Sequence, residues 1–198
     1  MRQDIHIHLA SGSQIRAQLL RNAGIEIAAK AVDVDEDSIK SRLLQAGSSP
    51  EEIALRLAQE KALALEADGY VIGADQVLDF DSTILSKPKD RAEAKKHLLI
   101  LRGQTHKLHS AVAVVRDHKQ AFHHVATVTL TMRAFSDGFL DEYLDRNWPE
   151  ISYAVGGYML EEEGGRLFRE IDGDYFTVLG LPLLPLLNFF ADEGAISA

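Results

Sequence analysis

The feature of the sequence that most constrains the fold is an apolar run that contains a single acid. Residues 70–78 read Tyr-Val-Ile-Gly-Ala-Asp-Gln-Val-Leu, and such a run is typical of a buried strand. The carboxylate of Asp75 is costly there unless a cation, a metal ion or hydrogen bonds meet it. Lys87, held in extended backbone by Pro88, follows after a short interval. The stretch alone leaves two interpretations: a functional carboxylate, or a surface salt bridge on an ordinary hairpin.

Composition excludes several classes of protein. The 198 residues, 46% hydrophobic and 26% charged, are typical of a globular protein with a substantial core. The net charge of -9 disfavours non-specific binding to nucleic acid or anionic membrane. The absence of cysteine excludes disulfides, thiolate metal sites and a cysteine nucleophile. No apolar run matches a signal peptide or a membrane span, so we expect a cytoplasmic protein.

A Ser-Gly-Ser turn separates a predicted strand, residues 5–10, from a predicted helix, Gln14–Asn22. Small residues before a helix let backbone N–H groups and the hydroxyls of Ser11 and Ser13 approach an anion. Arg16 falls in the first helical turn, where its guanidinium suits phosphate oxygens. The pattern therefore favours a phosphate site, with simple capping of the helix as the alternative.

A cluster of acids follows a second predicted strand, residues 25–34. Asp33, Asp35, Glu36 and Asp37 stand within five residues. A hard divalent cation requires carboxylates placed in this way at a strand end, whereas a solvated loop is the ordinary interpretation of such a cluster.

The next helix is predicted to begin at Ser49 as the N-cap, with Pro50 at the first position and Glu52 at the third. Lys61 belongs to an i, i+3, i+4, i+7 set with Leu57, Glu60 and Ala64, so its side chain is expected on the buried side. Two interpretations stay open for Lys61: a lysine that extends its charge to solvent, or a catalytic or phosphate-binding lysine.

The rest of the chain alternates strands and helices, and no long linker divides it. The predicted elements are a hairpin tip at 79–82, a helix capped by Asp90 through 101, strands at 106–116, 122–135 and 167–171, a helix capped by Ser136-Asp137 through 143, and an apolar helix over 183–190. The eight histidines are scattered, and no partner is apparent for His6/His8 or His123/His124. We therefore predict no histidine-rich metal site and strand histidines that face solvent.

Taken in order, these stretches resemble the Maf-type nucleoside triphosphate pyrophosphatases, the septum formation protein family. The resemblance covers most of the chain. Its markers are Leu9-Ala10-Ser11-Gly12-Ser13 with Arg16, Val34-Asp35-Glu36, Leu57-Ala58-Gln59-Glu60-Lys61-Ala62, Gly73-Ala74-Asp75-Gln76-Val77, Ser86-Lys87-Pro88, Gly103-Gln104-Thr105-His106, and Gly173-Asp174-Tyr175 with Val178-Leu179-Gly180-Leu181-Pro182-Leu183.

The resemblance implies an α/β fold: an elongated, curved mixed sheet flanked by helices, with two lobes and a central cleft in one domain over residues 1–198. It implies hydrolysis of a nucleoside triphosphate between the α and β phosphates, assisted by Mg²⁺ or Mn²⁺, and homodimers are common in such proteins. The implied phosphate contacts are Ser11, Ser13, Arg16, Lys61 and Lys87. Glu36 and Asp75 match the metal and water-activating carboxylates.

Departures from the family pattern indicate the substrate branch. The family's Pro-Arg-Arg after the serines is Gln14-Ile15-Arg16 here, so one phosphate contact is missing or supplied elsewhere. Gln76 stands where the dTTP/UTP branch often has Thr, Ala154 where a Lys is usual, and Glu161 where that branch has its base-reading Gln. In these features the chain is similar to the branch that acts on 7-methyl-GTP.

The chemistry of Glu161 agrees with this branch. A carboxylate only accepts hydrogen bonds, whereas guanine presents two neighbouring donors, and methylation at N7 adds positive charge to the base. The alternative is that Glu161 is one of three solvated acids with Glu162 and Glu163. The rival functions are a dTTP/UTP or broad house-cleaning pyrophosphatase, and a non-catalytic nucleotide-binding regulator of septum formation.

Overall fold

A computed structural model describes residues 6–197, whose backbone forms two compact units. Unit 1 comprises the chain up to Gln76, residues Ser110–Ala126, and the chain from Gly180. Unit 2 comprises Val77–His109 and Thr127–Leu179. The single-domain organisation and the central cleft expected from the sequence stay predictions.

The described strands form one mixed sheet of seven strands, in the order β2-β1-β3-β5-β6-β7, with β4 paired to β3. Strand β1 is parallel to β2 and β3, whereas β4 is antiparallel to β3 and β7 to β6. The predicted α/β class with a mixed, helix-flanked sheet is therefore confirmed. The strands are β1 (Ile7–Leu9), β2 (Ala28–Ala29), β3 (Tyr70–Phe80), β4 (Thr83–Leu85), β5 (Thr105–Arg116), β6 (Lys119–Met132) and β7 (Phe168–Asp172).

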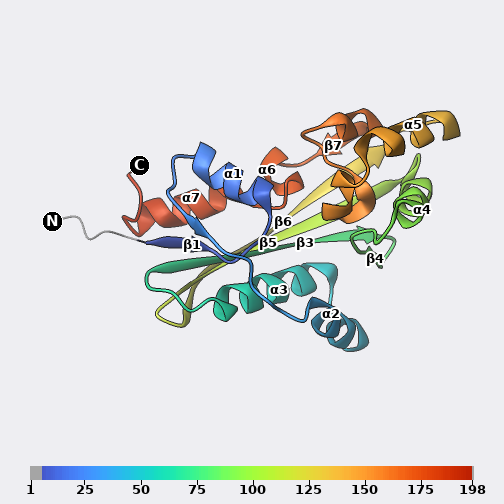
Figure 1. Ribbon diagram of the computed structural model, residues 1–198. Helices are drawn as coiled ribbons and strands as arrows, with labels where there is room; N and C mark the ends of the chain where they lie inside the picture. The colour runs from blue at the N-terminus through green and yellow to red at the C-terminus, as the bar shows by residue number, and fades with distance from the viewer. Residues whose placement is uncertain (1–5, 198) are drawn as a thin grey trace. The chain divides into compact units, whose positions relative to one another are not determined.

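Unit 1 holds four α-helices among its described residues: α1 (Gln14–Asn22), α2 (Glu36–Gln45), α3 (Pro50–Ala64) and α7 (Leu183–Asp192). Helices α1 and α7 lie on one face of the sheet, and α2 and α3 on the other (Figure 1). The capping box predicted for α3 is present, because Ser49 accepts from the Glu52 amide and Glu52 accepts in return. None of the helices described in residues 6–197 is long and apolar enough to cross a membrane.

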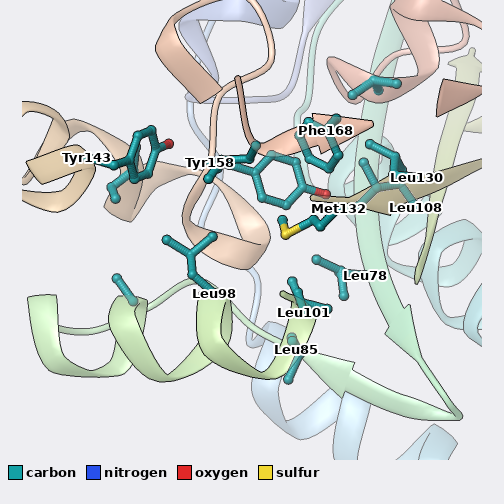
Figure 2. Packing of buried hydrophobic residues seen from close by; sticks show 14 of the residues in the cluster. Leu78, Leu85, Leu98, Leu101, Leu108, Leu130, Met132, Tyr143, Tyr158 and Phe168 are labelled. Atoms are coloured by element: carbon teal, nitrogen blue, oxygen red, sulfur yellow. The ribbon is translucent and has the colours of Figure 1, made fainter. Parts of the chain in front are cut away.

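Unit 2 contains α4 (Arg91–Leu101), α5 (Asp137–Asn147) and α6 (Tyr175–Val178), with short 3-10 helices at η1 (Glu150–Tyr153), η2 (Val155–Gly157) and η3 (Glu163–Leu167). Its core gathers leucines of β3, β4, β5, β6 and α4 around the rings of Tyr158 and Phe168, which meet edge to face (Figure 2). Asp90 and Ser136 cap α4 and α5 as the sequence predicts.

The strand predicted over residues 25–34 is wrong for most of its length. Only Ala28 and Ala29 pair, at the edge of the sheet, and both are exposed. Little apolar surface is therefore buried to hold an extended strand there. The acids that follow begin a helix instead, because the Asp35 carboxylate accepts from the Ser38 amide as the N-cap of α2. Glu36 thus lies in a first helical turn and not at a strand end.

The expectation that strand histidines face solvent is confirmed for His123, which is exposed in β6, but is wrong for His106 and His109, which are buried in β5. The Nε2 atom of His106 lies 2.7 Å from the hydroxyl of Tyr158. Burial lowers the pKa of His106 to about 4. An apolar core therefore holds this imidazole neutral.

The protonation of His106 predicts a loss of stability in mild acid. The unfolded chain takes up this proton near the ordinary value of 6.5, and the folded chain only near 4. The contribution is therefore complete above pH 6.5 and is lost as the pH falls toward 4. Between about pH 7.5 and about pH 5 we expect the free energy of unfolding to fall by about 2 kcal/mol from this group.

Urea denaturation at the two pH values measures this effect. His106→Gln, which cannot take up a proton, should lose that part of the pH dependence, whereas exposed His123→Gln should keep it. An unchanged pH dependence in His106→Gln contradicts the assignment.

Candidate active site

The candidate site is formed where α3 packs directly on β3 in unit 1. A Cβ atom added at Gly73 would lie 2.1 Å from the carbonyl oxygen of Ala58 and 2.5 Å from the amide nitrogen of Ala62. The absence of a side chain at Gly73 therefore allows the helix backbone to approach the strand. Lys61 of α3 and Asp75 of β3 are brought within reach of each other by this close contact.

Lys61 joins the two predicted carboxylates. Its Nζ lies 2.6 Å from Oδ1 of Asp75 and 2.7 Å from Oε1 of Glu36. The side chains of Lys61 and Asp75 are 12% and 7% exposed, so this pair is largely removed from water, while Glu36 at 36% is open to solvent. The other oxygen of Glu36 lies 3.5 Å from Nζ of Lys40. Three of the implied site residues, Glu36, Lys61 and Asp75, therefore lie together in the structure, and their roles in a reaction stay predictions.

Asp75 retains an unused acceptor. Among residues 6–197, its Oδ2 atom is buried and has no hydrogen-bond partner. A buried carboxylate oxygen in that state is unfavourable. It therefore marks the position at which a water molecule, a cation or a substrate group would be most strongly stabilised.

The donor set fits a hard divalent cation. Glu36 and Asp75 offer carboxylate oxygens only, as Mg²⁺ and Mn²⁺ prefer, and one of those oxygens is the unpaired Oδ2 of Asp75. No group of three or more acidic or histidine side chains suited to a metal occurs in the described part of the chain. The protein would thus supply two carboxylates, and water and phosphate oxygens the remaining ligands, which is the usual arrangement for Mg²⁺.

Arg16 is fixed beside this pair of carboxylates. Its Nε donates to the carbonyl of Gly180 at 2.8 Å, and its Nη1 donates to the carbonyl of Ala74 at 2.8 Å. Burial lowers the pKa of Arg16, and the negative charges of Asp75 and Glu36 oppose that shift. The guanidinium therefore stays a cation at neutral pH, with two of its donors already used by the backbone.

Gly180 makes room for this guanidinium. Its φ of +87° lies in the left-handed region, and an added Cβ would lie 3.0 Å from Nη2 of Arg16. A side chain here would both strain the backbone and displace the arginine. Site prediction from the sequence missed the role of Gly73 and Gly180, which is to leave room for the α3 backbone and for Arg16. The available signals were a lone glycine inside an apolar strand and a glycine after a short helix.

The two serines occupy the turn before α1. The amide of Ser13 donates to the Ser11 hydroxyl at 3.2 Å, and the Arg16 amide donates to the Ser13 hydroxyl at 3.4 Å. Ser13 is thus the N-cap, as the alternative interpretation had it, and both serines stay half-buried at the helix N-terminus. Gln76 follows Asp75, and its amide donates to the Ser110 hydroxyl at 2.9 Å. Phosphate or base binding by these residues stays a prediction.

Lys87 and Glu161 belong to unit 2. Lys87 is exposed and lies between β4 and α4, directly before buried Pro88. Glu161 is half-buried in the turn that precedes η3. Their predicted contributions to the site in unit 1 stay predictions.

Comparison with known proteins gives strong similarity to one family. A family model described as Maf-like protein matches residues 6–193. A nucleoside triphosphate pyrophosphatase of a Ruegeria species is 50% identical over 194 residues, which cover 96% of this chain and 98% of that protein. A 7-methyl-GTP pyrophosphatase of Rhizobium meliloti is 43% identical over 193 residues, with 96% and 97% of the two chains covered.

Among solved structures, a nucleoside-triphosphatase described as a dITP/XTP pyrophosphatase from Mycobacterium abscessus covers 98% of both chains with a TM-score of 0.45 and 13% identity. At this level of similarity that structure does not inform on the activity of this chain.

Proposed function

The chain belongs to the Maf-like protein family, and from that premise we propose that it is a nucleoside triphosphate pyrophosphatase that releases pyrophosphate and a nucleoside monophosphate. The observation that carries the proposal is the contact of Lys61 with Asp75 and Glu36 in a largely buried position. A structural salt bridge would need only one of these carboxylates. Two acids on one lysine, with an arginine beside them, form a site suited to a polyanion and a hydrolytic water.

The residues have distinct roles in the proposed reaction. Asp75 uses its unpaired Oδ2 to accept a proton or a hydrogen bond from the attacking water, as a general base requires. Lys61, anchored through Oδ1 of the same carboxylate, provides positive charge for the phosphate oxygens. Ser11, Ser13 and the amides at the start of α1 bind a phosphate group at the helix N-terminus. Lys87 is proposed as a further cation for the phosphates.

Glu36 and Asp75 would hold the divalent cation. When bound, it neutralises negative charge that builds on the phosphoryl oxygens. Positioning and charge stabilisation are the main requirements of phosphoryl transfer. The fixed placement of Lys61 and Arg16 is therefore expected to matter as much for the rate as the general base Asp75.

Glu161 supports 7-methyl-GTP as the preferred substrate. The three adjacent acids differ in environment: Glu162 is exposed, Glu163 is paired with Arg146 and Arg166, and Glu161 is half-buried. Burial raises the pKa of Glu161, and the charge of Glu162 adds to the shift. A half-buried carboxylate of this kind is stabilised by donors such as those of guanine and by the positive charge of a 7-methylated base.

Replacing Glu161 by glutamine should weaken the preference for 7-methyl-GTP over UTP. Glu161→Gln offers a donor and an acceptor to the base, as a uracil edge requires. We expect kcat/KM for 7-methyl-GTP relative to UTP to fall by about 5- to 150-fold, from about 1–3 kcal/mol of discrimination. The exposed neighbour variant Glu162→Gln serves as the matched control and should keep the wild-type ratio. An unchanged ratio in Glu161→Gln refutes base reading by this residue.

Turnover across 7-methyl-GTP, GTP, UTP, dTTP and CTP, with pyrophosphate release in Mg²⁺ or Mn²⁺, tests the proposed function directly. Highest kcat/KM on 7-methyl-GTP supports the assigned branch, whereas highest values on dTTP and UTP indicate the pyrimidine branch. Nucleotide binding without turnover in either metal would contradict the enzymatic proposal and favour a regulatory role.

A further inference from the structure

The segment that carries Glu161 is held at its first residue by the core of unit 2. We define the acidic loop as residues 158–164. Tyr158 is 4% exposed, and its hydroxyl lies 2.7 Å from Nε2 of His106 in β5. Its ring packs edge to face on Phe168, at 4.9 Å between centroids. The start of the acidic loop is therefore fixed by both burial and a hydrogen bond.

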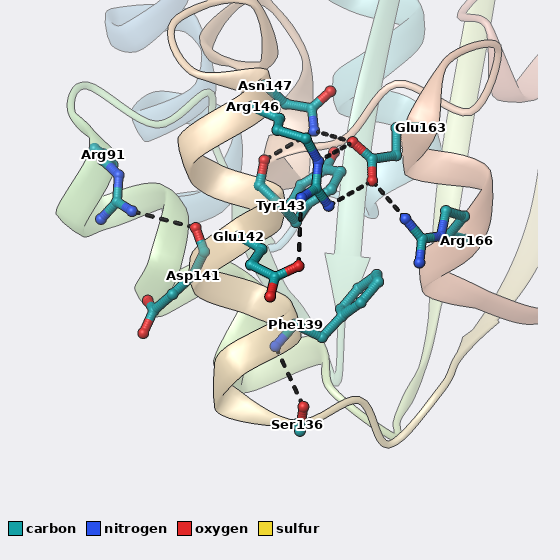
Figure 3. Close-up of polar contacts among 10 residues, drawn as sticks. All are labelled: Arg91, Ser136, Phe139, Asp141, Glu142, Tyr143, Arg146, Asn147, Glu163 and Arg166. Atoms are coloured by element: carbon teal, nitrogen blue, oxygen red, sulfur yellow. Dashed lines mark hydrogen bonds and ion pairs between the residues drawn. The ribbon is translucent and has the colours of Figure 1, made fainter.

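The other end of the acidic loop is held by charge. Glu163 accepts from Nε of Arg146 at 3.0 Å and from Nη2 of Arg146 at 2.7 Å, so the pair is bidentate. Asn147 donates at 2.9 Å and Arg166 at 2.7 Å to the same carboxylate (Figure 3). These hydrogen bonds lower the pKa of Glu163 to about 2. The carboxylate is therefore ionised and fully engaged at neutral pH.

Between these two anchors the backbone closes on itself. The amide of Glu162 donates to the carbonyl of Met159 at 3.3 Å. A Cβ atom added at Gly164 would lie 2.3 Å from that carbonyl oxygen, so only glycine permits the approach. Glu161 thus occupies a turn of defined shape, and its position depends on how firmly the turn is held.

Helix α5 provides the support for the acidic loop. Tyr143, Arg146 and Asn147 stand at i, i+3 and i+4, which places them on one face of the helix. The buried hydroxyl of Tyr143 donates to the carbonyl of Gly157 at 3.5 Å, just before the acidic loop. The two following residues of this face bind Glu163 (Figure 3).

This arrangement divides the acids of the acidic loop by function. Arg146 and Arg166 both pair with Glu163. Among the ion pairs of residues 6–197, neither arginine reaches Glu161, because both are taken up by Glu163. The two arginines therefore fix the backbone at Glu163 and leave the negative charge of Glu161 available to the base of a nucleotide.

We propose that Arg146 is a positioning residue for nucleotide selection: by fixing Glu163 it holds Glu161 ready for the base. This inference rests on the proposed function, because it assigns Arg146 a role only through Glu161. A carboxylate that is held in place binds with less loss of conformational freedom than one on a loose turn. The clamp, defined as Arg146 with Glu163, thus acts on the base and not on the phosphates.

The test compares Arg146→Met with Arg91→Met. Arg146 is 46% exposed and its replacement keeps the aliphatic stem, so the fold should tolerate it. Arg91 of α4 is a matched control, because it pairs with Asp145 of α5, the helix that carries Arg146. Among the residues described, Arg91 has no hydrogen bond or ion pair to the acidic loop. We expect Arg146→Met to lower the ratio of kcat/KM for 7-methyl-GTP to that for UTP roughly tenfold, through KM. Arg91→Met should keep the wild-type ratio.

A second background separates the two proposals. In Glu161→Gln, the further change Arg146→Met should no longer alter the ratio, because the residue that the clamp positions is gone. If Glu161→Gln changes the ratio and Arg146→Met does not, the clamp proposal fails and base reading by Glu161 stands. If Arg146→Met lowers turnover of both nucleotides equally, its role is structural and the proposal is overturned.

Hydrogen exchange gives a readout that does not depend on activity. Amides of the acidic loop should exchange faster in Arg146→Met than in the wild type, while Arg91→Met should leave them unchanged. In Arg146→Lys the exchange rates should lie between those of the wild type and of Arg146→Met, since lysine cannot reproduce the bidentate contact. Unchanged exchange in Arg146→Met contradicts the clamp even if no nucleotide is hydrolysed.

Discussion

Asp75→Asn should lower kcat by at least about a thousandfold while the protein stays folded, because the loss of a general base and of its charge removes effects of this order. Asparagine has nearly the same shape as aspartate, but it cannot take up a proton from water. Its NH2 group must replace either Oδ1, which accepts from Lys61, or the unpaired Oδ2. The fold is expected to persist because Lys61 keeps its second partner, Glu36. Pyrophosphate release at saturating nucleotide measures the effect.

Circular dichroism and urea denaturation of the same variant establish that it is folded. Asp68→Asn is the matched control, since Asp68 is exposed in the turn before β3 and its side chain lies outside the site. That variant should retain wild-type turnover. An Asp75→Asn enzyme within about tenfold of the wild type would exclude Asp75 as the base.

Gly73→Ala should be severely destabilising, although it adds a single methyl group. The new Cβ would lie 2.1 Å from the Ala58 carbonyl oxygen and 2.9 Å from the Ala62 Cβ, and the first is a backbone atom that cannot rotate away. Helix α3 must shift from β3, which we expect to cost about 2–4 kcal/mol in the free energy of unfolding. The shift should also separate Lys61 from Asp75, so that the folded fraction turns over more slowly.

Gly138→Ala provides the comparison for the same chemical change. Gly138 lies in α5 with nothing within 4 Å of an added Cβ, so alanine there should stabilise by about 0.5–1 kcal/mol. Urea denaturation of both variants, with kcat measured on the folded protein, tests the prediction. Gly73→Ala with wild-type stability would show that the close approach of α3 to β3 does not hold the site together.

Local features of the chain were predictable from the sequence. The capping box at Ser49 and Glu52, the N-caps Ser13 and Asp90, and the apolar run that becomes β3 act between near neighbours. Such signals depend on backbone geometry over a few residues, which is why they are visible without a fold. The resemblance to the Maf family, which the family match confirms, then indicated which distant residues to compare.

Where local signals were weak, prediction from sequence failed. Residues 25–34 have an apolar pattern, but at the edge of the sheet only Ala28 and Ala29 pair. Asp35, a favourable N-cap residue, instead begins α2. His106 is a polar residue in an alternating strand, and nothing local showed that a core would surround it and that the Tyr158 hydroxyl would meet it. Burial is a property of the assembled unit.

By itself, the sequence determined the order of most elements, their caps and the family to which the chain belongs. Only the tertiary structure decided that Lys61 contacts both Asp75 and Glu36, that Gly73 has no room for a side chain, and that Arg16 uses two donors on backbone carbonyls. The physical reason is distance along the chain. Contacts between residues far apart in sequence depend on how helices pack against the sheet, and neighbouring residues carry little information about that packing.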